Sequence, residues 1–434
     1  MARVAIIGSG ISGLSVACGL GPWADVTLFE AENYFGGHAH TVDITLEGRT
    51  HGVDTGFLVY NERTYPNLIR LFGELGVQTA ASDMSFSVQV PDIGLEWSGR
   101  DMNAVFAQRR NIVRPGFLRM LGDIVRFNRI TTDIAECEAE KELDQPICEF
   151  FTANRFGCEF RDWYFLPMIG CIWSCPTDQM LRFPVAAMIR FCHNHGLLQI
   201  ANRPRWFTVT GGAKHYVAKM LTKIPDARVK TPVRHVHRHL RSHCQSEVVV
   251  TTDLGSERFD HVVFACHSDQ SLALLANPSS AEREILGSIT YRPNRAVLHT
   301  DTSVLPKRRR AWAAWNYERA IERMREQTSV CVHYLINRLQ PLPFETPVLV
   351  SLNPVRDPRP ATVHGEFEYS HPVFDQAAIA AQRRVPSLQG VGNTWYCGAW
   401  TRYGFHEDGL TSGLAVVEAL KQKIAASLVA SEAA

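Results

Sequence analysis

Long apolar runs, an excess of charge and a regular cysteine spacing are all missing from this chain of 434 residues. No apolar run approaches the roughly 20 residues that a membrane span needs, so any membrane contact is expected to be peripheral. Lys and Arg number 45 against 44 Asp and Glu, which leaves a formal net charge of +1 and no indication of nucleic acid as a partner. The composition thus argues against integral membrane proteins and basic nucleic-acid-binding proteins.

The 11 cysteines fit no disulfide framework, and no secretory leader is visible. Both features are typical of a protein whose thiols stay reduced, so we expect a cytoplasmic location, with a peripheral position at the inner face of the membrane left open. With 45% hydrophobic and 21% charged residues, the chain has the composition of a soluble globular protein of more than one domain. The sequence gives no indication of an oligomeric state.

What the sequence does contain is a glycine-rich turn near its start. "ARVAIIGSGISGLSVACGL" has an apolar strand, a GxGxxG loop and a helix of small and apolar residues, and a second strand, "DVTLFE", ends at Glu30. Gly8 permits the tight turn, Gly10 lets the backbone approach a pyrophosphate, and Gly13 lets the helix pack on the sheet. Glu30 stands where a carboxylate accepts the hydroxyls of an adenosine ribose. The predicted dinucleotide contacts are Gly8, Ser9, Gly10, Ile11, Ser12, Gly13, Glu30 and Ala31.

The residues after the second strand indicate which dinucleotide is bound. In "AENYFGGHAHT", Gly36, Gly37 and Thr41 match the motif of the flavoprotein superfamily of amine oxidases, protoporphyrinogen oxidases and phytoene-type desaturases, which the segment resembles. Two arginines of that motif are replaced here by Tyr34 and His38. By resemblance His38 faces the pyrophosphate or the flavin, and the alternative is a loop histidine that binds nothing. "VDTGF" resembles the strand that approaches the flavin ring, which adds Thr55, Gly56 and Phe57.

By the same resemblance the nucleotide domain is discontinuous. The expected fold class is α/β, with a Rossmann-type FAD-binding domain (glutathione-reductase-like) and an inserted α+β substrate domain as in amine oxidases. Residues 1–58, 204–270 and 386–434 are assigned to the FAD-binding domain, in which the backbone of Val233 would hold the adenine and "FDHVVFAC" is a buried parallel strand. Residues 59–203 and 271–385 are assigned to the substrate domain, and apolar spacing predicts that the first of these segments is largely helical.

The stretch "NTWYCGAWTRYGFHEDGLTSGL" resembles the strand, loop and helix start that form the second wall of the flavin site. Free N–H groups and the positive end of a helix dipole stabilise the negative charge that a flavin gains on reduction. By resemblance the contacts here are Gly398, Trp400, Gly409 and Leu410. His406 takes the place of a tyrosine that lines the amine cage of amine oxidases, and we expect it to act as a base oriented by Glu407 or Asp408. A histidine that only caps the loop is the alternative.

The cofactor is expected to be non-covalent FAD, because "ATVHGEFEYSHPVFD" lacks the cysteine that tethers flavin in some relatives. No second GxGxxG loop follows, so electrons are expected to come from the substrate and not from NAD(P)H. "GFLVYNERTYPNL", "NRLQPL", "SLNP" and "YGFHEDGLTSGL" are most similar to a bacterial family of NAD/FAD-binding proteins encoded beside cyclopropane-fatty-acid synthases. This resemblance implies an FAD-dependent oxidoreductase of the desaturase or oxidase type, with a hydrophobic, acyl-chain substrate.

Three other functions stay open on the sequence: a double-bond isomerase that returns the hydride, an amine oxidase, and a non-enzymatic prenyl-binding chaperone. The intact glycine loop, Glu30 and the C-terminal helix start argue against the last of these.

Two further groups of residues have alternative interpretations. His235, His237 and His239 alternate on a predicted strand near His243 and Cys244, but no CxxC or HExxH frame supports a metal site, and we expect none there or at Cys171 and Cys175. Basic residues interleave with apolar ones in "RPGFLRMLGDIVRFNRI" and in the run "KRRR" before "AWAAWNY". Such stretches are either solvated helix faces or docking surfaces for anionic lipid.

Overall fold

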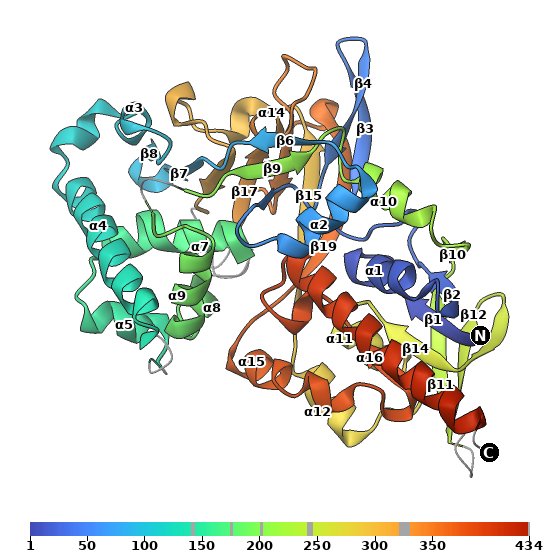
Figure 1. Ribbon diagram of the computed structural model, residues 1–434. Helices are drawn as coiled ribbons and strands as arrows, with labels where there is room; N and C mark the ends of the chain where they lie inside the picture. Colours follow the sequence, from blue (N-terminus) through green and yellow to red (C-terminus); the bar gives the residue numbers. More distant parts are fainter. Residues whose placement is uncertain are drawn as a thin grey trace.

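The computed structural model describes residues 1–139, 143, 145–173, 177–199, 203–240, 246–320 and 330–432. Figure 1 shows a helical lobe at one end, a large sheet in the middle, and a second lobe that contains both chain termini. Among the described residues, no helix combines the length and the apolar character that a membrane span requires. His243, Cys244 and Cys175 lie outside the described residues.

The lobe with the termini is built on a five-stranded sheet of parallel strands. Its order is β10 (Asp226–Arg228), β2 (Ala24–Phe29), β1 (Ala2–Ile7), β14 (His261–Phe264) and β20 (Thr394–Tyr396). β1 and β14 are apolar because both of their faces are covered. Helices α1 (Ile11–Leu20) and α16 (His406–Glu432) cover one face. The antiparallel strands β11 (Val233–Leu240), β12 (Ser246–Thr252) and β13 (Gly255–Phe259) cover the other.

This arrangement confirms the predicted Rossmann-type fold. The strand predicted in "FDHVVFAC" is β14, and it lies between β1 and β20, which come from opposite ends of the chain. Helices α11 (Ser268–Leu274), α12 (Ser280–Gly287) and α15 (Gln376–Gln382) follow on the side of β14 and β20.

Between the lobes lies a mixed seven-stranded sheet. Its order is β19 (Val363–Pro372), β15 (Tyr291–His299), β18 (Leu349–Leu352), β17 (Cys331–Leu335), β16 (Trp315–Glu318), β7 (Phe86–Val90) and β8 (Leu95–Ser98). Strand β7 pairs in parallel with β16, so this sheet joins the two inserted segments. The segment 59–203 is therefore less helical than its apolar spacing predicts, because β6 (Thr79–Ser82), β7 and β8 precede its long helices.

Smaller elements connect the sheet to the nucleotide domain. The hairpin β3 (Thr41–Leu46) and β4 (Arg49–Asp54) follows the second glycine motif, and β9 (Trp206–Val209) lies between β5 (Tyr60–Asn61) and β6. Helices α2 (Pro66–Leu75) and α10 (Lys214–Leu221) pack with α1 in one apolar core. The short helix α14 (Ile336–Leu339) follows β17 directly.

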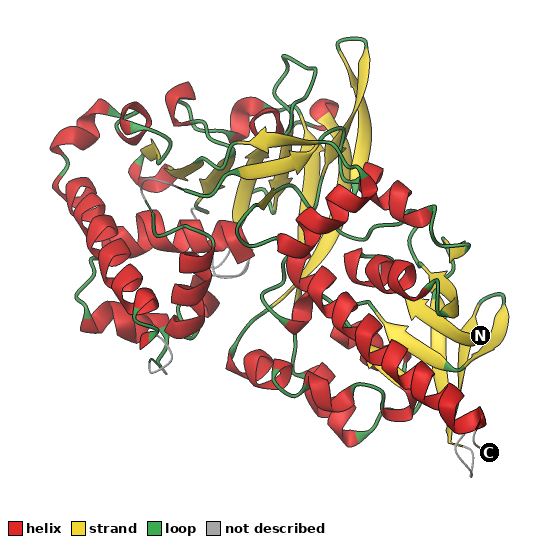
Figure 2. Ribbon diagram, viewed as in Figure 1, coloured by secondary structure: helices red, strands yellow, loops and turns green. Residues whose placement is uncertain are grey.

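The lobe at the opposite end from the chain termini is almost entirely helical (Figure 2), and its core is rich in aromatic side chains. It consists of α3 (Met102–Val105), α4 (Pro115–Glu136), α5 (Ile147–Ala153), α6 (Cys158–Phe160), α7 (Leu166–Trp173), α8 (Thr177–Met180) and α9 (Val185–Asn194). Proline at the first position of α4 suits a helix start, and Phe127 of this helix lies edge-on to Phe151 and Phe165.

The seven-stranded sheet also encloses a charged network. His333 Nε2 lies 3.0 Å from Glu318 Oε2, and His333 Nδ1 lies 2.6 Å from Ser351 Oγ. Burial alone would lower the pKa of His333, but contacts with Cys331 and Glu318 outweigh it and raise the pKa to about 9. The ligand atoms of Glu318, Cys331 and His333 lie within 4.8 Å of one another, a spacing that a metal site would also show. These atoms are already engaged with one another in the hydrogen-bonded network.

Candidate flavin site

The first glycine loop leaves the carboxyl end of β1 and enters α1. A Cβ atom on Gly13 would lie 1.9 Å from the Gly8 carbonyl oxygen, so the helix and the turn require glycine there. Gly10 is different, because nothing lies within 4 Å of the position that its Cβ would take. In the described part of the chain, no side-chain cap is made at the α1 N-terminus, where Gly10 is the N-cap residue, so N–H groups there are available to an anion. This is a cradle that fits a pyrophosphate.

Glu30, at the carboxyl end of β2, fixes this loop. Its Oε2 accepts hydrogen bonds from the backbone N of Ser9 at 3.0 Å and from Ser9 Oγ at 2.5 Å, while its Oε1 accepts one from the N of Glu32 at 2.9 Å. The Thr231 N–H donates to the Glu30 carbonyl at 2.7 Å. Glu30 is thereby placed beside the segment that leads to Val233, where the adenine was expected, and Ala31 is exposed at the same edge.

The second glycine motif crosses the first. The Gly36 N–H donates to the Ser9 carbonyl at 3.1 Å, and a Cβ on Gly37 would lie 3.2 Å from the Gly10 Cα. Both residues have positive φ, 117° at Gly36 and 57° at Gly37, which suits glycine. The segment thus runs over the predicted pyrophosphate loop.

Residues 55–57 then pair with residues 38–40. The Thr55 N–H donates to the His40 carbonyl at 2.9 Å, and the Phe57 N–H donates to the His38 carbonyl at 2.7 Å. A Cβ on Gly56 would lie only 2.3 Å from the His38 carbonyl oxygen. This pairing places the Phe57 ring parallel to the His406 ring, with centroids 3.9 Å apart.

The start of α16 packs on the start of α1, as Figure 1 shows for the two helices. A Cβ on Gly409 would lie 2.9 Å from Ile11 Cγ2 and 3.0 Å from Ser12 Oγ. Ser412 Oγ accepts a hydrogen bond from the Gly398 N at 2.9 Å, which holds the preceding strand against the helix. The two glycine segments from opposite ends of the chain therefore meet at one place.

Two expected cofactor contacts have their side chains in the protein core. Trp400 is 2% exposed and donates from Nε1 to the Cys266 carbonyl at 3.1 Å. Leu410 is also 2% exposed and packs in the same core as Ile11 and Leu14. Only the backbone of these two residues is left to face a cofactor.

The residue that orients His406 is Tyr216 of α10, which the sequence analysis missed. Its hydroxyl lies 2.6 Å from His406 Nε2. Glu407 instead accepts hydrogen bonds from the backbone N of Asn67 and of Leu68, both at 3.0 Å, and so caps α2. Asp408 accepts from the Phe405 N at 3.0 Å. The two acids thus fix the ends of helices, and no local pattern could identify a tyrosine 190 residues away.

A group of half-buried histidines surrounds His38. The His38 ring lies 5.1 Å from Tyr369, 5.4 Å from His371 and 6.3 Å from His267, measured between centroids. Burial, together with neighbouring histidines, lowers the pKa of His38 and His267 to about 4 and that of His371 and His406 to about 3. All four imidazoles are therefore neutral at pH 7.

His38 Nε2 is buried and has no hydrogen-bond partner among the residues that the structure describes. A buried polar atom without a partner is costly, so this nitrogen fits a site that a ligand completes. Together with the open Gly10 and the uncapped α1, it shows that the residues present suit a dinucleotide. His267 and His371 were not predicted, because His267 caps the start of α11 and His371 lies in β19, both far from the glycine motifs in the sequence.

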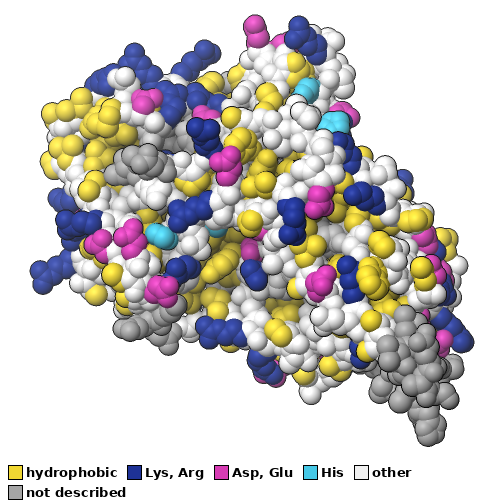
Figure 3. All heavy atoms as spheres, viewed as in Figure 1, with side chains coloured by type: hydrophobic (Ala, Val, Ile, Leu, Met, Phe, Trp, Pro, Cys, Tyr) yellow, Lys and Arg dark blue, Asp and Glu magenta, His cyan; other side chains and the backbone are white. Residues whose placement is uncertain are grey.

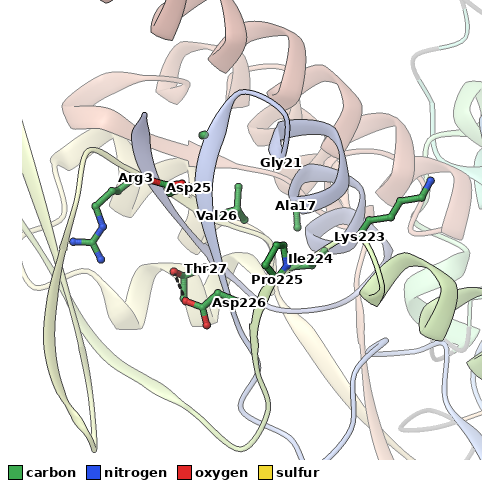
Figure 4. A pocket seen from close by; sticks show the side chains of 11 residues that line it. Arg3, Ala17, Gly21, Asp25, Val26, Thr27, Lys223, Ile224, Pro225 and Asp226 are labelled. Carbon is green, nitrogen blue, oxygen red and sulfur yellow. Dashed lines mark hydrogen bonds between the residues drawn. The ribbon is translucent and has the colours of Figure 1, made fainter.

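Figure 4 shows a surface pocket on the same domain, lined among others by Arg3, Val26, Lys223, Pro225 and Asp226. It lies where β1, β2 and β10 begin, whereas ligands of such sheets bind at the carboxyl ends of the strands. It is therefore separate from the site described above. The three histidines of β11 that alternate in the sequence are exposed, as expected for a solvated strand face.

Comparison with solved structures shows the same fold. The chain is similar to a CLA-producing fatty acid isomerase from P. acnes (15% identity, TM-score 0.66, covering 96% of this chain and 98% of that one). It is also similar to wild-type putrescine oxidase bound to putrescine (14% identity, TM-score 0.65, covering 96% of this chain and 98% of that one). A third similar structure is cyclohexylamine oxidase from Brevibacterium oxydans IH-35A (16% identity, TM-score 0.64, covering 98% of this chain and 99% of that one). No curated protein matches the sequence.

Residues 11–335, about three-quarters of the chain, match the family model of flavin containing amine oxidoreductases. The match extends from the start of α1 through β17. The fold, the glycine cradle and this match agree, and the chain belongs to the flavin containing amine oxidoreductase family as an FAD-dependent oxidoreductase.

Proposed function

We propose that this enzyme oxidises a hydrophobic acyl-chain substrate at a carbon next to a double bond. FAD, when bound, supplies an acceptor for hydride at its N5 atom. The protein's own contribution is to bind an uncharged chain and to take up the proton that the substrate loses. Non-covalent binding of FAD is part of the proposal.

The observation that carries the proposal is the uncharged histidine group. An amine is a cation at pH 7 before it is oxidised, and its recognition uses a carboxylate or an aromatic cage. Here the residue that replaces the cage tyrosine is His406, and it lies beside His38, whose pKa is also lowered by burial. Neutral imidazoles offer no negative charge that could bind an ammonium group. An acyl chain is uncharged, so its binding requires no charged partner.

An aromatic wall leads from His406 into the helical lobe. Phe405 stacks on Phe191 of α9 with centroids 5.1 Å apart, and Phe191 lies 4.5 Å from Trp173 of α7 and 4.0 Å from His195. Burial lowers the pKa of His195 to about 4, so this ring is also neutral. The wall is continuous with the apolar core of that lobe and suits a hydrocarbon substrate.

His406 is the proposed proton acceptor. In the neutral tautomer whose Nε2–H donates to the Tyr216 oxygen, Nδ1 carries the free lone pair and can accept a proton. Tyr216 fixes the orientation of the ring, and the parallel Phe57 ring limits its tilt. An acceptor held this way can return the proton to a neighbouring carbon as well as release it.

That second possibility makes double-bond isomerisation the alternative function. It is favoured by the position of His406, half-buried between Phe57 and Tyr216, where a proton can be retained. The solved fatty acid isomerase supports the alternative only as a protein of the same fold.

The test is anaerobic mixing of the purified yellow protein with unsaturated fatty acids and phospholipids, and in parallel with putrescine and cyclohexylamine. We expect the flavin absorbance to bleach with an acyl substrate and not with either amine. Mass spectrometry of the lipid then separates a desaturated product from an isomer of unchanged mass. Bleaching by amines alone would refute the acyl proposal, and a colourless protein without affinity for FAD would favour the chaperone.

A further inference from the structure

We propose that the outer tip of the helical lobe is a docking surface for anionic phospholipid bilayers. The tip surface is defined here as residues 100–126 together with residues 307–310. The proposal rests on the composition and exposure of this surface and does not depend on which substrate the enzyme oxidises.

The tip surface brings together two basic stretches that are almost two hundred residues apart in the sequence. The short helix η6 (Arg309–Ala311) packs against α3 and β8. Glu96 of β8 accepts hydrogen bonds from the backbone N of Lys307 at 3.1 Å and of Arg308 at 3.2 Å. The run of basic residues is thus anchored beside the start of the helical lobe.

Exposed apolar side chains are concentrated on the same surface. Five of the large hydrophobic residues that face solvent fall within 24 positions: Met102, Ile112, Val113, Leu118 and Val125. Val113 is 79% exposed and Met102 is 70% exposed. Figure 3 shows yellow atoms bordered by dark blue ones at the upper left, where α3 lies in Figure 1. Apolar side chains grouped in this way mark an interaction site.

The charge of the tip surface is strongly positive. Residues 100–126 contain six arginines and two aspartates, and residues 307–310 add four basic residues without an acid. Four of its arginines are paired with a carboxylate: Arg100 with Asp101 at 2.8 Å, Arg119 with Glu159 at 3.3 Å, Arg126 with Asp123 at 2.8 Å and Arg308 with Glu96 at 3.2 Å. The other basic residues exceed the carboxylates there, so the surface keeps a net positive charge. Arg309 and Arg310 are both exposed.

This combination fits a lipid headgroup layer better than a nucleic acid. A polyanion in water needs only the arginines, and exposed valine and methionine would add nothing to its binding. A bilayer uses both, because the apolar tips enter the boundary of the acyl chains while the cations meet the phosphates. Arginine stems also reach across apolar surface with their charged ends in the headgroup layer.

The experiment uses full-length, FAD-loaded protein and flotation with vesicles of phosphatidylcholine, either pure or mixed with phosphatidylglycerol. We expect binding to the mixed vesicles that weakens as salt rises, and little binding to pure phosphatidylcholine. Arg309→Gln with Arg310→Gln removes two cations and should weaken binding roughly thirty-fold. Ile112→Ser with Val113→Ser should weaken it roughly ten-fold or more.

Matched variants on the other lobe test whether the loss of any exposed apolar side chain, or of any two exposed cations, weakens vesicle binding. Leu254→Ser removes a side chain that is 86% exposed on the β12–β13 hairpin, and Lys223→Gln with Lys423→Gln removes two exposed cations. Both should bind as the unchanged protein does, with equal flavin content in all variants. Equal binding by the tip variants, loss of binding in the control variants, or no preference for phosphatidylglycerol would each overturn the proposal.

Discussion

The proposed proton transfer depends on two side chains from different helices, His406 of α16 and Tyr216 of α10. The imidazole is the proposed proton acceptor, and the hydroxyl of Tyr216, 2.6 Å from its Nε2, determines which nitrogen is free. The ring is held neutral because burial and the proximity of His38 lower its pKa to about 3. Because its pKa is about 3, the ring can hold the substrate's proton only briefly, as an imidazolium ion, before passing it on.

His406→Gln is expected to retain FAD and to slow flavin reduction by the substrate by roughly 10²- to 10⁴-fold. Tyr216→Phe keeps His406 but removes the hydroxyl that orients its ring, so the rate of flavin reduction should fall by a smaller factor. Stopped-flow absorbance measures both rates, and the flavin spectrum at rest controls for cofactor binding. Unchanged reduction by the His406 variant would remove this residue from the mechanism.

Single residues also show where sequence reasoning ends. Gly8, Gly13 and Glu30 were predicted because motif, spacing and local structure coincide within thirty positions. His267 and His371 carry no such local signal, since only the fold brings the start of α11 and the end of β19 close to His38.

At the scale of elements, the contact between α1 and α16 depends on small residues. A Cβ on Gly413 would lie 2.2 Å from Ser15 Oγ and 2.7 Å from the Ser12 carbonyl oxygen. The backbone oxygen cannot move away without displacing α1, so the two helices would have to separate. The glycine loop that begins α1 would move with it.

Gly413→Ala is therefore expected to destabilise the protein by about 1–3 kcal/mol and to lower its FAD content. Gly73→Ala in α2 is the matched control, because nothing lies within 4 Å of its added Cβ. That variant should be neutral or more stable by up to about 1 kcal/mol. Thermal unfolding and flavin absorbance per protein measure both effects, and equal behaviour of the two variants would contradict the packing argument.

Strands β16 and β17 contribute a second pair that can be tested. His333 and Glu318 are buried on these neighbouring strands, with Nε2 and Oε2 3.0 Å apart, and Arg356 reaches Glu318 Oε1 at 3.2 Å from the surface. His333→Leu or Glu318→Leu alone should cost about 3–5 kcal/mol, because each leaves a buried group without its partner. The double variant should cost less than the two single losses added together. Chemical denaturation of all three measures this coupling, and strict additivity would show that the pair does not interact.

Elements were predicted from the sequence to different degrees. The strand and helix of the opening motif and the buried strand β14 have strong local patterns, and all are present. Strands β6 and β7 were missed because "TAASDMSFSVQV" is short and rich in serine, and the pairing of β7 with β16 is set by distant residues.

At the scale of the whole molecule, the neutral histidines make the free energy of unfolding depend on pH. The folded pKa values of His38, His267, His371 and His406 lie at about 3 to 4, below the ordinary value of 6.5. Below pH 6.5 the unfolded chain therefore binds more protons than the folded one, and the free energy of unfolding falls as pH falls. His333 acts in the opposite direction, since its raised pKa favours the folded state until pH passes about 9.

We expect the midpoint of thermal unfolding to decrease between pH 7 and pH 5, before most carboxylates titrate. In His371→Asn the midpoint should decrease less steeply over the same range, because the variant lacks one of the imidazoles that the fold keeps neutral. The unfolding curves are measured at each pH from the rise in flavin fluorescence as the heated protein releases its cofactor. A flat profile, or one equally steep in the variant, would show that these rings are not kept neutral by the fold.

The contact between the two terminal helices also sets an order of events during synthesis. Helix α1 is made at the start, and α16 follows almost four hundred residues later. The surface of Ile11 and Ser12 that fits Gly409 therefore has no cover from this helix until α16 has been made. A complete cofactor site thus forms only after the helical lobe, which lies between the two helices in the sequence, has been synthesised.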